Sequence, residues 1–174
     1  MVEPVAFAHA HGILHRDLKP SNVMLGPFGE VLVMDWGVAL VLGRAGEADT
    51  PGTVLGTPGF MSPEQATGSD VDERSDVFGL GAILRSVLQP RAGLPRALGA
   101  IVRRATAADP AGRYQTAAAL GDDIRAFLDG QPVAAHREGP LERVARLAAR
   151  HRVAILLFSA YIVMRALILI FRGI

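Results

Sequence analysis

Two carboxylates and one carboxamide stand in a fixed order near the start of the chain. Residues 15–22 read HRDLKPSN, which places Asp17 five residues before Asn22, and Asp35 follows in the tripeptide Asp35-Trp36-Gly37. Side chains of these types accept protons and bind hard cations. An isolated Asp or Asn in a loop is more often a turn former or a cap. The whole octapeptide, with a second motif one hairpin away, is too specific for chance and indicates a site that carries chemistry.

The elements around these residues are predicted by local patterns. Apolar runs at residues 23–25 and 30–34 flank residues 26–29, GPFG, and predict a β-hairpin between the two motifs. Residues 50–59 are rich in Gly, Thr and Pro and predict a loop. Helical spacing of apolar residues predicts helices over 75–88, 94–105 and 116–128, the last stopped by Gly130. The expected fold is mainly α with a small β-hairpin.

The composition excludes several classes of protein. The chain has 174 residues, of which 50% are hydrophobic, with a net charge of +1 and no cysteine. The absence of cysteine excludes a disulfide scaffold and a cysteine-ligated metal site. The small net charge and the aromatic content of 6% argue against a nucleic-acid partner.

The motifs resemble those of the eukaryotic-like serine/threonine protein kinases. Residues 15–22 resemble the catalytic loop, and Asp35-Trp36-Gly37 resembles the metal-binding motif, with Trp in place of the familiar Phe. Three later segments resemble the end of the activation segment, the start of the central helix and a late arginine motif: residues 56–64 (GTPGFMSPE), 76–81 (DVFGLG) and 109–114 (DPAGRY). The resemblance covers residues 5 to 130 and implies a protein-kinase-like C-lobe.

The resemblance implies roles in phosphoryl transfer, which needs positioning and charge neutralisation. Asp17 is expected to accept the proton of the substrate hydroxyl, and Lys19 to place its ammonium on the transferring phosphate. Asn22 and Asp35 are expected to hold Mg²⁺ beside ATP, because a hard cation prefers oxygen ligands.

Other positions are given regulatory or structural roles by the same resemblance. Arg16 is expected to pair with a phosphorylated activation segment, and Thr57 to contact the catalytic loop. Thr50 and Thr53 are the candidate phosphate acceptors, although both are equally interpreted as plain loop residues. The resemblance gives structural roles to five residues: His15, Gly37, Glu64, Asp76 and Arg113. Among these, Glu64 is expected to form an ion pair with Arg113, and Asp76 to be hydrogen-bonded to the catalytic-loop backbone.

A complete kinase also has an N-terminal lobe with a glycine-rich loop and a lysine that orients ATP. Lys19 is the only lysine of this sequence, and no Gly-x-Gly-x-x-Gly is present. We therefore expect a truncated serine/threonine kinase that is inactive as the chain stands, acting on a protein substrate in its full-length lineage. The alternative is a pseudokinase-like, membrane-tethered binding module with a partner protein. A third hypothesis, a helical adaptor, leaves Asp17, Asn22 and Asp35 without a purpose.

The C-terminal residues predict a membrane anchor. Residues 153–171 are mostly apolar, with Arg165 as their only charge, and as a helix they would extend about 28 Å, close to the thickness of a bilayer core of roughly 30 Å. A buried core helix is the alternative. Four arginines lie at residues 143–152 and Arg172 follows the span, so the positive-inside rule places the kinase-like part in the cytoplasm.

The expected organisation is therefore a C-lobe over residues 1–130, a basic juxtamembrane segment over 131–152 and a single transmembrane helix over 153–171. Residues 141–152 read LERVARLAARHR, which predicts either a helix lying against anionic lipid or a solvated basic linker. Membrane lipid is thus an expected partner of residues 141–172.

Overall fold

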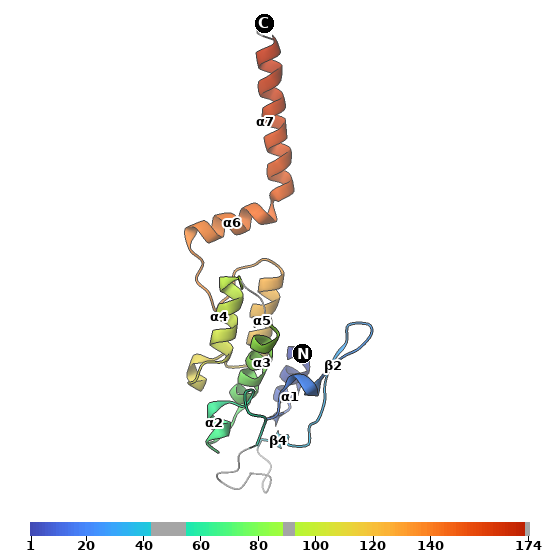
Figure 1. Cartoon of the computed structure of the whole chain (residues 1–174), viewed down its shortest axis with the longest axis vertical. Coiled ribbons are helices and arrows are strands. Elements are labelled where there is room, and N and C mark those ends of the chain that lie inside the picture. Colours follow the sequence, from blue (N-terminus) through green and yellow to red (C-terminus); the bar gives the residue numbers. More distant parts are fainter. Residues whose placement is uncertain (43–54, 89–92, 173–174) are drawn as a thin grey trace. The chain divides into compact units, whose positions relative to one another are not determined.

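The computed structural model describes residues 1–42, 55–88 and 93–172. It divides into two compact units, Met1–His136 and Arg137–Ile174 (Figure 1). Thr50 and Thr53 lie outside the described residues, so the structure adds nothing to the two candidate phosphate acceptors.

The first unit contains five α-helices, four short strands and two 3₁₀ turns among its described residues. In chain order these are α1 (Val2–Ala10), β1 (Ile13–Leu14), η1 (Pro20–Asn22), β2 (Val23–Leu25), β3 (Val31–Val33), β4 (Leu40–Val41), α2 (Pro63–Ala66), α3 (Glu73–Leu88), α4 (Arg96–Ala105), η2 (Pro110–Gly112) and α5 (Ala117–Leu128). A mainly helical fold is confirmed.

The predicted hairpin is present, and a second strand pair accompanies it. Strands β2 and β3 pair antiparallel with Val23 opposite Val33, and the turn between them includes Gly29 at φ 88°. Strands β1 and β4 form a separate antiparallel pair with Leu14 opposite Leu40. The prediction of one hairpin was therefore incomplete, because strands of two residues are too short to show an alternating pattern.

The three predicted helices begin within two residues of their predicted positions, and the caps of α4 and α5 explain the differences there. Helix α4 begins at Arg96 rather than at residue 94, because Pro95 occupies its N-cap and disfavours helical geometry in the residue before it. Helix α5 begins at Ala117 because the Thr116 hydroxyl accepts a hydrogen bond from the Ala119 amide at 3.1 Å.

The core of this unit lies among α1, α3, α4 and α5, which Figure 1 shows side by side. Fully buried apolar side chains come from each of these helices: Val5, Val77, Leu80, Ile101 and Leu120. Helices α3 and α4 approach closely at Gly81, where an added Cβ would lie 2.6 Å from the Cβ of Ala105. A glycine is needed there because the neighbouring helix fills the space of a side chain.

The second unit consists of α6 (Pro140–Arg150) and α7 (Arg152–Arg172). Helix α7 covers the residues predicted to span a membrane. Within the described residues, however, no helix taken alone is long and apolar enough for a crossing. The segments Pro140–Ala148 and Arg152–Ile168 meet that requirement only as a pair, with a bend of 78° between them.

Candidate active site

Asp76, in the first turn of α3, holds the backbone at residues 15 and 16, where the loop 15–22 begins. Its carboxylate accepts hydrogen bonds from the amides of His15 at 2.7 Å and Arg16 at 2.8 Å, and from Nε2 of His9 at 2.9 Å. Arg16 has a φ of 66°, in the left-handed region that a non-glycine residue rarely adopts. The buried Asp76 carboxylate therefore holds a strained loop in place, and such strain is found where side chains must be positioned accurately.

Asp17, Lys19 and Thr57 form a closed triangle of hydrogen bonds. The Lys19 ammonium donates to Oδ2 of Asp17 at 2.6 Å and to the Thr57 hydroxyl at 3.0 Å. That hydroxyl donates its proton to Oδ1 of Asp17 at 2.7 Å. Partial burial raises the pKa of Asp17, but the hydrogen bonds from Lys19 and Thr57 outweigh burial and set the pKa below its usual value. Asp17 is thus an oriented, ionised carboxylate at neutral pH.

Asn22 and Asp35 lie at the same open end of the β2–β3 hairpin. The Met34 amide donates to the Asn22 carbonyl at 2.8 Å, which continues the ladder beyond Val23 and Val33 and places Asp35 next. The Asn22 side-chain nitrogen donates to the Asp17 carbonyl at 2.9 Å, so Oδ1 is the Asn22 atom that a cation could use. Asp35 is exposed and has a φ of 59°.

These two residues fit a magnesium ion that also binds phosphate. In the described part of the chain, no three His, Asp or Glu side chains are grouped to hold a metal by themselves. Magnesium is usually held by one or two carboxylates together with substrate phosphates, and it prefers oxygen ligands. A Cβ added to Gly37 would lie 3.3 Å from Oδ1 of Asp35, so glycine keeps this carboxylate uncrowded.

His15 connects the two motifs through the protein interior. Its ring is fully buried, and Nε2 lies 3.0 Å from the Met34 carbonyl, which can only accept a hydrogen bond. Nε2 therefore carries the proton, and Nδ1 accepts from the Asp17 amide at 3.3 Å. The ring packs against Trp36 with centroids 4.6 Å apart. The indole that replaces the familiar Phe is accommodated by this packing and by its hydrogen bond to the Val33 carbonyl at 3.0 Å.

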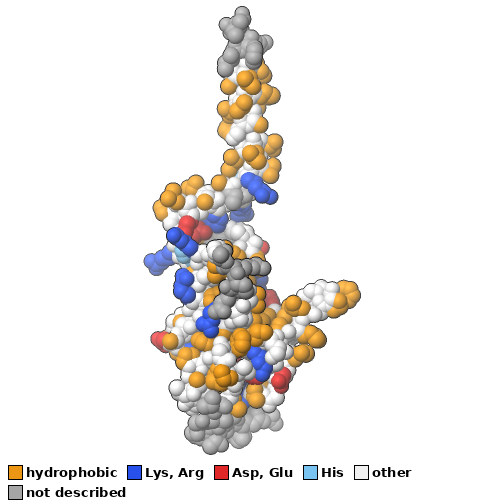
Figure 2. Space-filling view, in the orientation of Figure 1, with side chains coloured by type: hydrophobic (Ala, Val, Ile, Leu, Met, Phe, Trp, Pro, Cys, Tyr) orange, Lys and Arg blue, Asp and Glu red, His pale blue; other side chains and the backbone are white. Residues whose placement is uncertain are grey.

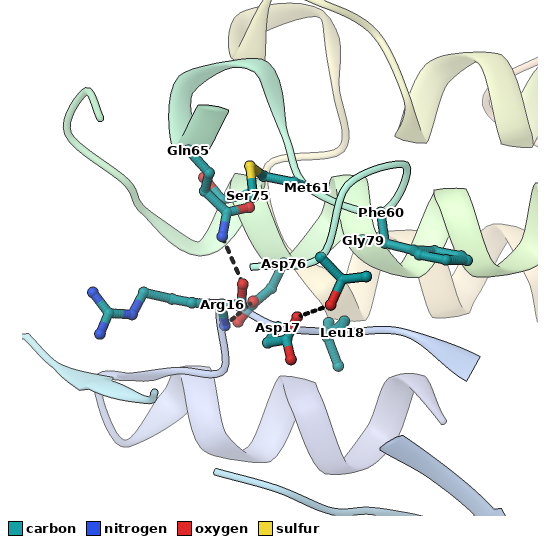
Figure 3. Close-up of a pocket in the computed structure, with 10 residues that line it drawn as sticks. Arg16, Asp17, Leu18, Phe60, Met61, Gln65, Ser75, Asp76 and Gly79 are labelled. Carbon is teal, nitrogen blue, oxygen red and sulfur yellow. Dashed lines mark hydrogen bonds between the residues drawn. The ribbon is translucent and has the colours of Figure 1, made fainter. Parts of the chain in front are cut away.

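Gln65, on α2, connects the loop 15–22 to the segment that precedes α2 (Figure 3). Its side-chain amide donates to the Arg16 carbonyl at 2.6 Å and to the Leu55 carbonyl at 3.3 Å. The Arg16 guanidinium donates in turn to the Val38 carbonyl at 2.6 Å. Sequence analysis missed Gln65, although one signal was available: Ser62 and Gln65 form a capping box at the start of α2, with the spacing Ser-x-x-Gln.

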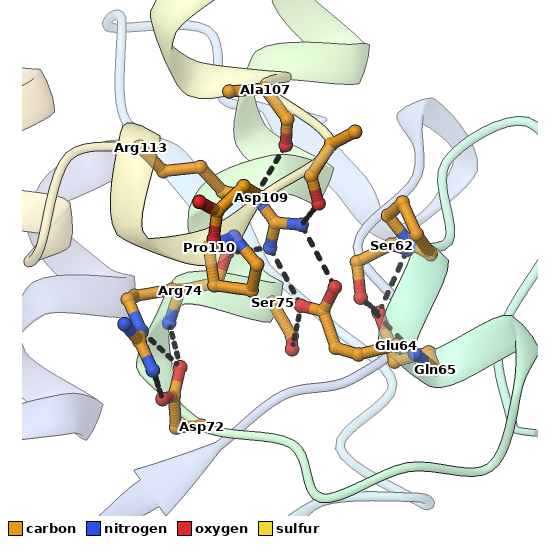
Figure 4. Close-up of polar contacts among 12 residues, drawn as sticks. Ser62, Glu64, Gln65, Asp72, Arg74, Ser75, Ala107, Asp109, Pro110 and Arg113 are labelled. Carbon is orange, nitrogen blue, oxygen red and sulfur yellow. Dashed lines mark hydrogen bonds and ion pairs between the residues drawn. The ribbon is translucent and has the colours of Figure 1, made fainter.

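The fully buried Arg113 and the largely buried Glu64 form a bidentate ion pair (Figure 4). Nη1 and Nη2 of Arg113 donate to the two Glu64 oxygens at 2.6 and 2.8 Å. The remaining three N–H groups donate to the carbonyls of Ala107, Ala108 and Arg74, so all five donors of the guanidinium are used. Burial raises the pKa of Glu64, but hydrogen bonds from Arg113 and Ser75 outweigh it and lower the pKa to about 2.

This pair ties distant segments together. Glu64 lies on α2, directly after the residues that include Thr57, and Arg113 follows η2. The Ser75 hydroxyl adds a hydrogen bond to Glu64 at 2.6 Å from the start of α3, next to Asp76. The position of Thr57 against Asp17 is therefore connected, through α2 and α3, to the C-terminal half of the unit.

Comparison with known proteins places this arrangement in a family. The model of the protein kinase domain matches residues 1–107. Similar proteins include the serine/threonine-protein kinase PknB of Mycobacterium tuberculosis, 38% identical over 154 residues, and a probable serine/threonine-protein kinase of Streptomyces coelicolor, 38% identical over 163 residues. The serine/threonine-protein kinase PknD of Chlamydia caviae is 34% identical over 172 residues.

The matches cover 72%, 78% and 74% of this chain and 25%, 24% and 18% of the respective relatives. The chain thus spans a quarter or less of the length of these proteins. The kinase domain model covers more than half of the chain, and the relatives are bacterial serine/threonine kinases. The chain therefore belongs to the protein kinase family.

Proposed function

We propose that residues 1–136 carry the phosphoryl-transfer and metal-binding half of a kinase that acts on serine or threonine hydroxyls of proteins. The observation that carries this proposal is the triangle of Asp17, Lys19 and Thr57. It presents an ionised carboxylate with a cation bonded to the same carboxylate. A substrate hydroxyl needs a base in reach, and a transferring phosphate needs a nearby positive charge. Lys19 supplies that charge from the base's own loop.

The nucleotide site is assigned to the open end of the hairpin. Asn22 and Asp35 would hold Mg²⁺, and ATP with this ion supplies the phosphoryl group. Asp17 accepts the proton of the substrate hydroxyl, while Lys19 neutralises charge on the phosphate oxygens. Thr57 keeps the carboxylate turned toward the lysine. The similarity to kinases that are named for serine and threonine supports the choice of acceptor.

We further propose that the 174 residues by themselves transfer phosphate negligibly. Lys19 is the only lysine in the sequence and is bonded to Asp17 and Thr57, so none of the chain's lysines remains to orient the nucleotide phosphates. The same observation favours the second candidate function, a pseudokinase-like binding module that engages a partner protein through this lobe.

The test compares the chain alone with a fusion that places a kinase N-terminal lobe ahead of Met1. Phosphate incorporation into a generic protein substrate is measured with Mg²⁺-ATP, and the variant Asp17→Asn is expected to lower the rate of the fusion by about 10² to 10⁴. Asp122→Asn, an exposed carboxylate on α5, is the matched control and should leave the rate unchanged.

Activity of the chain alone, lost in Asp17→Asn, would disprove the proposed inactivity. A folded but inactive fusion would favour the binding module. Labelling with an ATP analogue that acylates nearby amines distinguishes a badly assembled fusion from an inactive one. Lys19 is the only lysine that the chain itself contributes to the fusion, so labelling mapped to residue 19 reports nucleotide bound beside this loop.

We also propose that α6 and α7 attach the lobe to membrane lipid, with residues 1–150 on the cytoplasmic side and α7 in the bilayer. The apolar composition of residues 153–171 and the arginines that precede them support this orientation. Protease treatment of sealed inverted vesicles tests it: the lobe should be digested while α7 is protected.

A further inference from the structure

Helix α6 carries a row of apolar side chains that stays exposed within its own unit, residues 137–172. Leu141, Val144 and Leu147 recur at the helical spacing that places them on one face, and they are 85%, 65% and 49% exposed. A contiguous exposed apolar stripe of this kind requires a partner. Figure 2 shows hydrophobic side chains gathered along α6, with blue arginine side chains beside them.

The charges on α6 indicate which partner the stripe fits. Arg143 and Arg150 are exposed and lie seven residues apart, so they share one side of the helix, next to Leu147. Arg146 is engaged differently: its Nε lies 2.9 and 3.1 Å from the two oxygens of Glu138.

The acidic residues of this segment stabilise the helix start. Glu142 accepts a hydrogen bond from the Gly139 amide at 3.1 Å and completes the N-terminal cap of α6. Glu138 lies before the helix and pairs with Arg146. The exposed charges beside the apolar stripe are therefore basic, which complements an anionic surface.

We propose that α6 lies flat on an anionic lipid surface, with Leu141, Val144 and Leu147 in the acyl region and Arg143 and Arg150 at the phosphate groups. This inference deepens the proposed membrane attachment and rests on it. A helix with an apolar face and basic flanks is the form that lies in a membrane interface. The bend of 78° between Pro140–Ala148 and Arg152–Ile168 suits one helix in the plane of the surface and the other entering it.

The experiment uses the absence of cysteine from the chain. Three single-cysteine variants of the full chain, Val144→Cys, Arg150→Cys and Leu157→Cys, are labelled with a nitroxide and reconstituted into vesicles that contain phosphatidylglycerol. Collision with a water-soluble paramagnetic reagent is measured by electron paramagnetic resonance. We expect the labels at residues 144 and 157 to be protected and the label at residue 150 to be accessible.

The arginine contribution is tested in the Val144→Cys background. Each of Arg143→Gln and Arg150→Gln should lower the docking equilibrium about fivefold in anionic vesicles, and the pair together should restore access of the reagent to residue 144. Arg125→Gln, an exposed arginine of α5, is the matched control and should leave the protection unchanged. In vesicles of phosphatidylcholine alone, the label at residue 144 should be accessible while that at residue 157 stays protected.

The outcomes distinguish flat docking of α6 from the proposed attachment of the chain to the membrane. In the vesicles that contain phosphatidylglycerol, an accessible label at residue 144 with a protected label at residue 157 would overturn flat docking and leave the anchor standing. Accessibility at both would overturn the attachment as well. Dipolar broadening between labels at residue 144 on two chains would identify a second copy instead of lipid and would also overturn the inference.

Discussion

Replacing Arg113 with methionine should lower the free energy of unfolding of the first unit far more than replacing an arginine on its surface. Methionine keeps an unbranched apolar stem but removes all five donors of the guanidinium, whose side chain is fully buried. The variant leaves the Glu64 carboxylate, only 12% exposed, with the Ser75 hydroxyl but without its cation. The carbonyls of Ala107, Ala108 and Arg74 lose a donor at the same time.

The magnitude follows from the burial of this pair. Breaking a buried ion pair by removing one partner costs about 3–5 kcal/mol, since the remaining charge stays desolvated. A domain is stable by roughly 5–15 kcal/mol, so the loss is a large share of the total. The matched control is Arg125→Met. Arg125 pairs with Asp122 at 2.8 Å, but the two side chains are 58% and 72% exposed, so its loss should cost less than about 1 kcal/mol.

The pH dependence gives a second, independent signature. The pKa of Glu64 is lowered from 4.5 to about 2 in the folded chain, so its contribution to the free energy of unfolding is fully present above pH 4.5 and is lost as the pH falls toward 2. Between pH 7 and pH 3.5, the free energy of unfolding of the wild-type chain should fall by about 1 kcal/mol because of Glu64. In Arg113→Met, protonation at low pH removes the unpaired charge of Glu64. The difference in the free energy of unfolding between variant and wild type should therefore be smaller at pH 3.5 than at pH 7.

The assay is urea unfolding of the full chain in a mild non-ionic detergent, followed by the fluorescence of Trp36, the only tryptophan. With a denaturant slope of about 2 kcal/mol per molar urea, the midpoint of Arg113→Met should fall by about 2 M at pH 7. A fall below 0.5 M, within about 1 kcal/mol of the wild type, would refute the reasoning. So would a difference that is the same at pH 7 and pH 3.5.

Two further substitutions probe packing and the end of the lobe. Gly81→Ala should destabilise the fold by about 1–3 kcal/mol because the new Cβ meets Ala105. Gly99→Ala should stabilise α4 by up to about 1 kcal/mol, since its Cβ would lie 3.3 Å from the flexible end of Arg103 and at ordinary contact distance, 3.8 Å, from Leu94. Equal effects of the two substitutions in thermal unfolding would contradict this account. Tyr114→Phe removes the hydrogen bond from the buried phenol to Asp123 at 2.8 Å and should cost about 1–2 kcal/mol, measured by the same unfolding; an unchanged midpoint would show that this bond contributes nothing.

The local parts of the fold were predictable because they depend on neighbours in sequence. Apolar residues at helical spacing marked α3, α4 and α5, and the GPFG turn marked the β2–β3 hairpin. The strands β1 and β4 were not predictable, since Leu14 pairs with Leu40 across a long separation and each strand has only two residues. The hairpin predicted between Asn22 and Asp35 was enough to place these two residues at the same end of it.

By itself, the sequence determined the order and type of the chemical groups: a carboxylate, a lysine and an amide within one octapeptide, then a second carboxylate one hairpin later. It also determined the amphipathic face of α6, because side-chain direction follows from helical spacing.

The tertiary structure decided how those groups are held. It brought Gln65 to the Arg16 carbonyl across 49 residues, and it gave Asp76 three hydrogen bonds to segments 60 or more residues away. It also paired Arg146 with Glu138 and left Arg143 exposed on the same helix. Such contacts depend on the packing of whole elements, which no local pattern specifies, since one donor can find an acceptor only after the chain has folded.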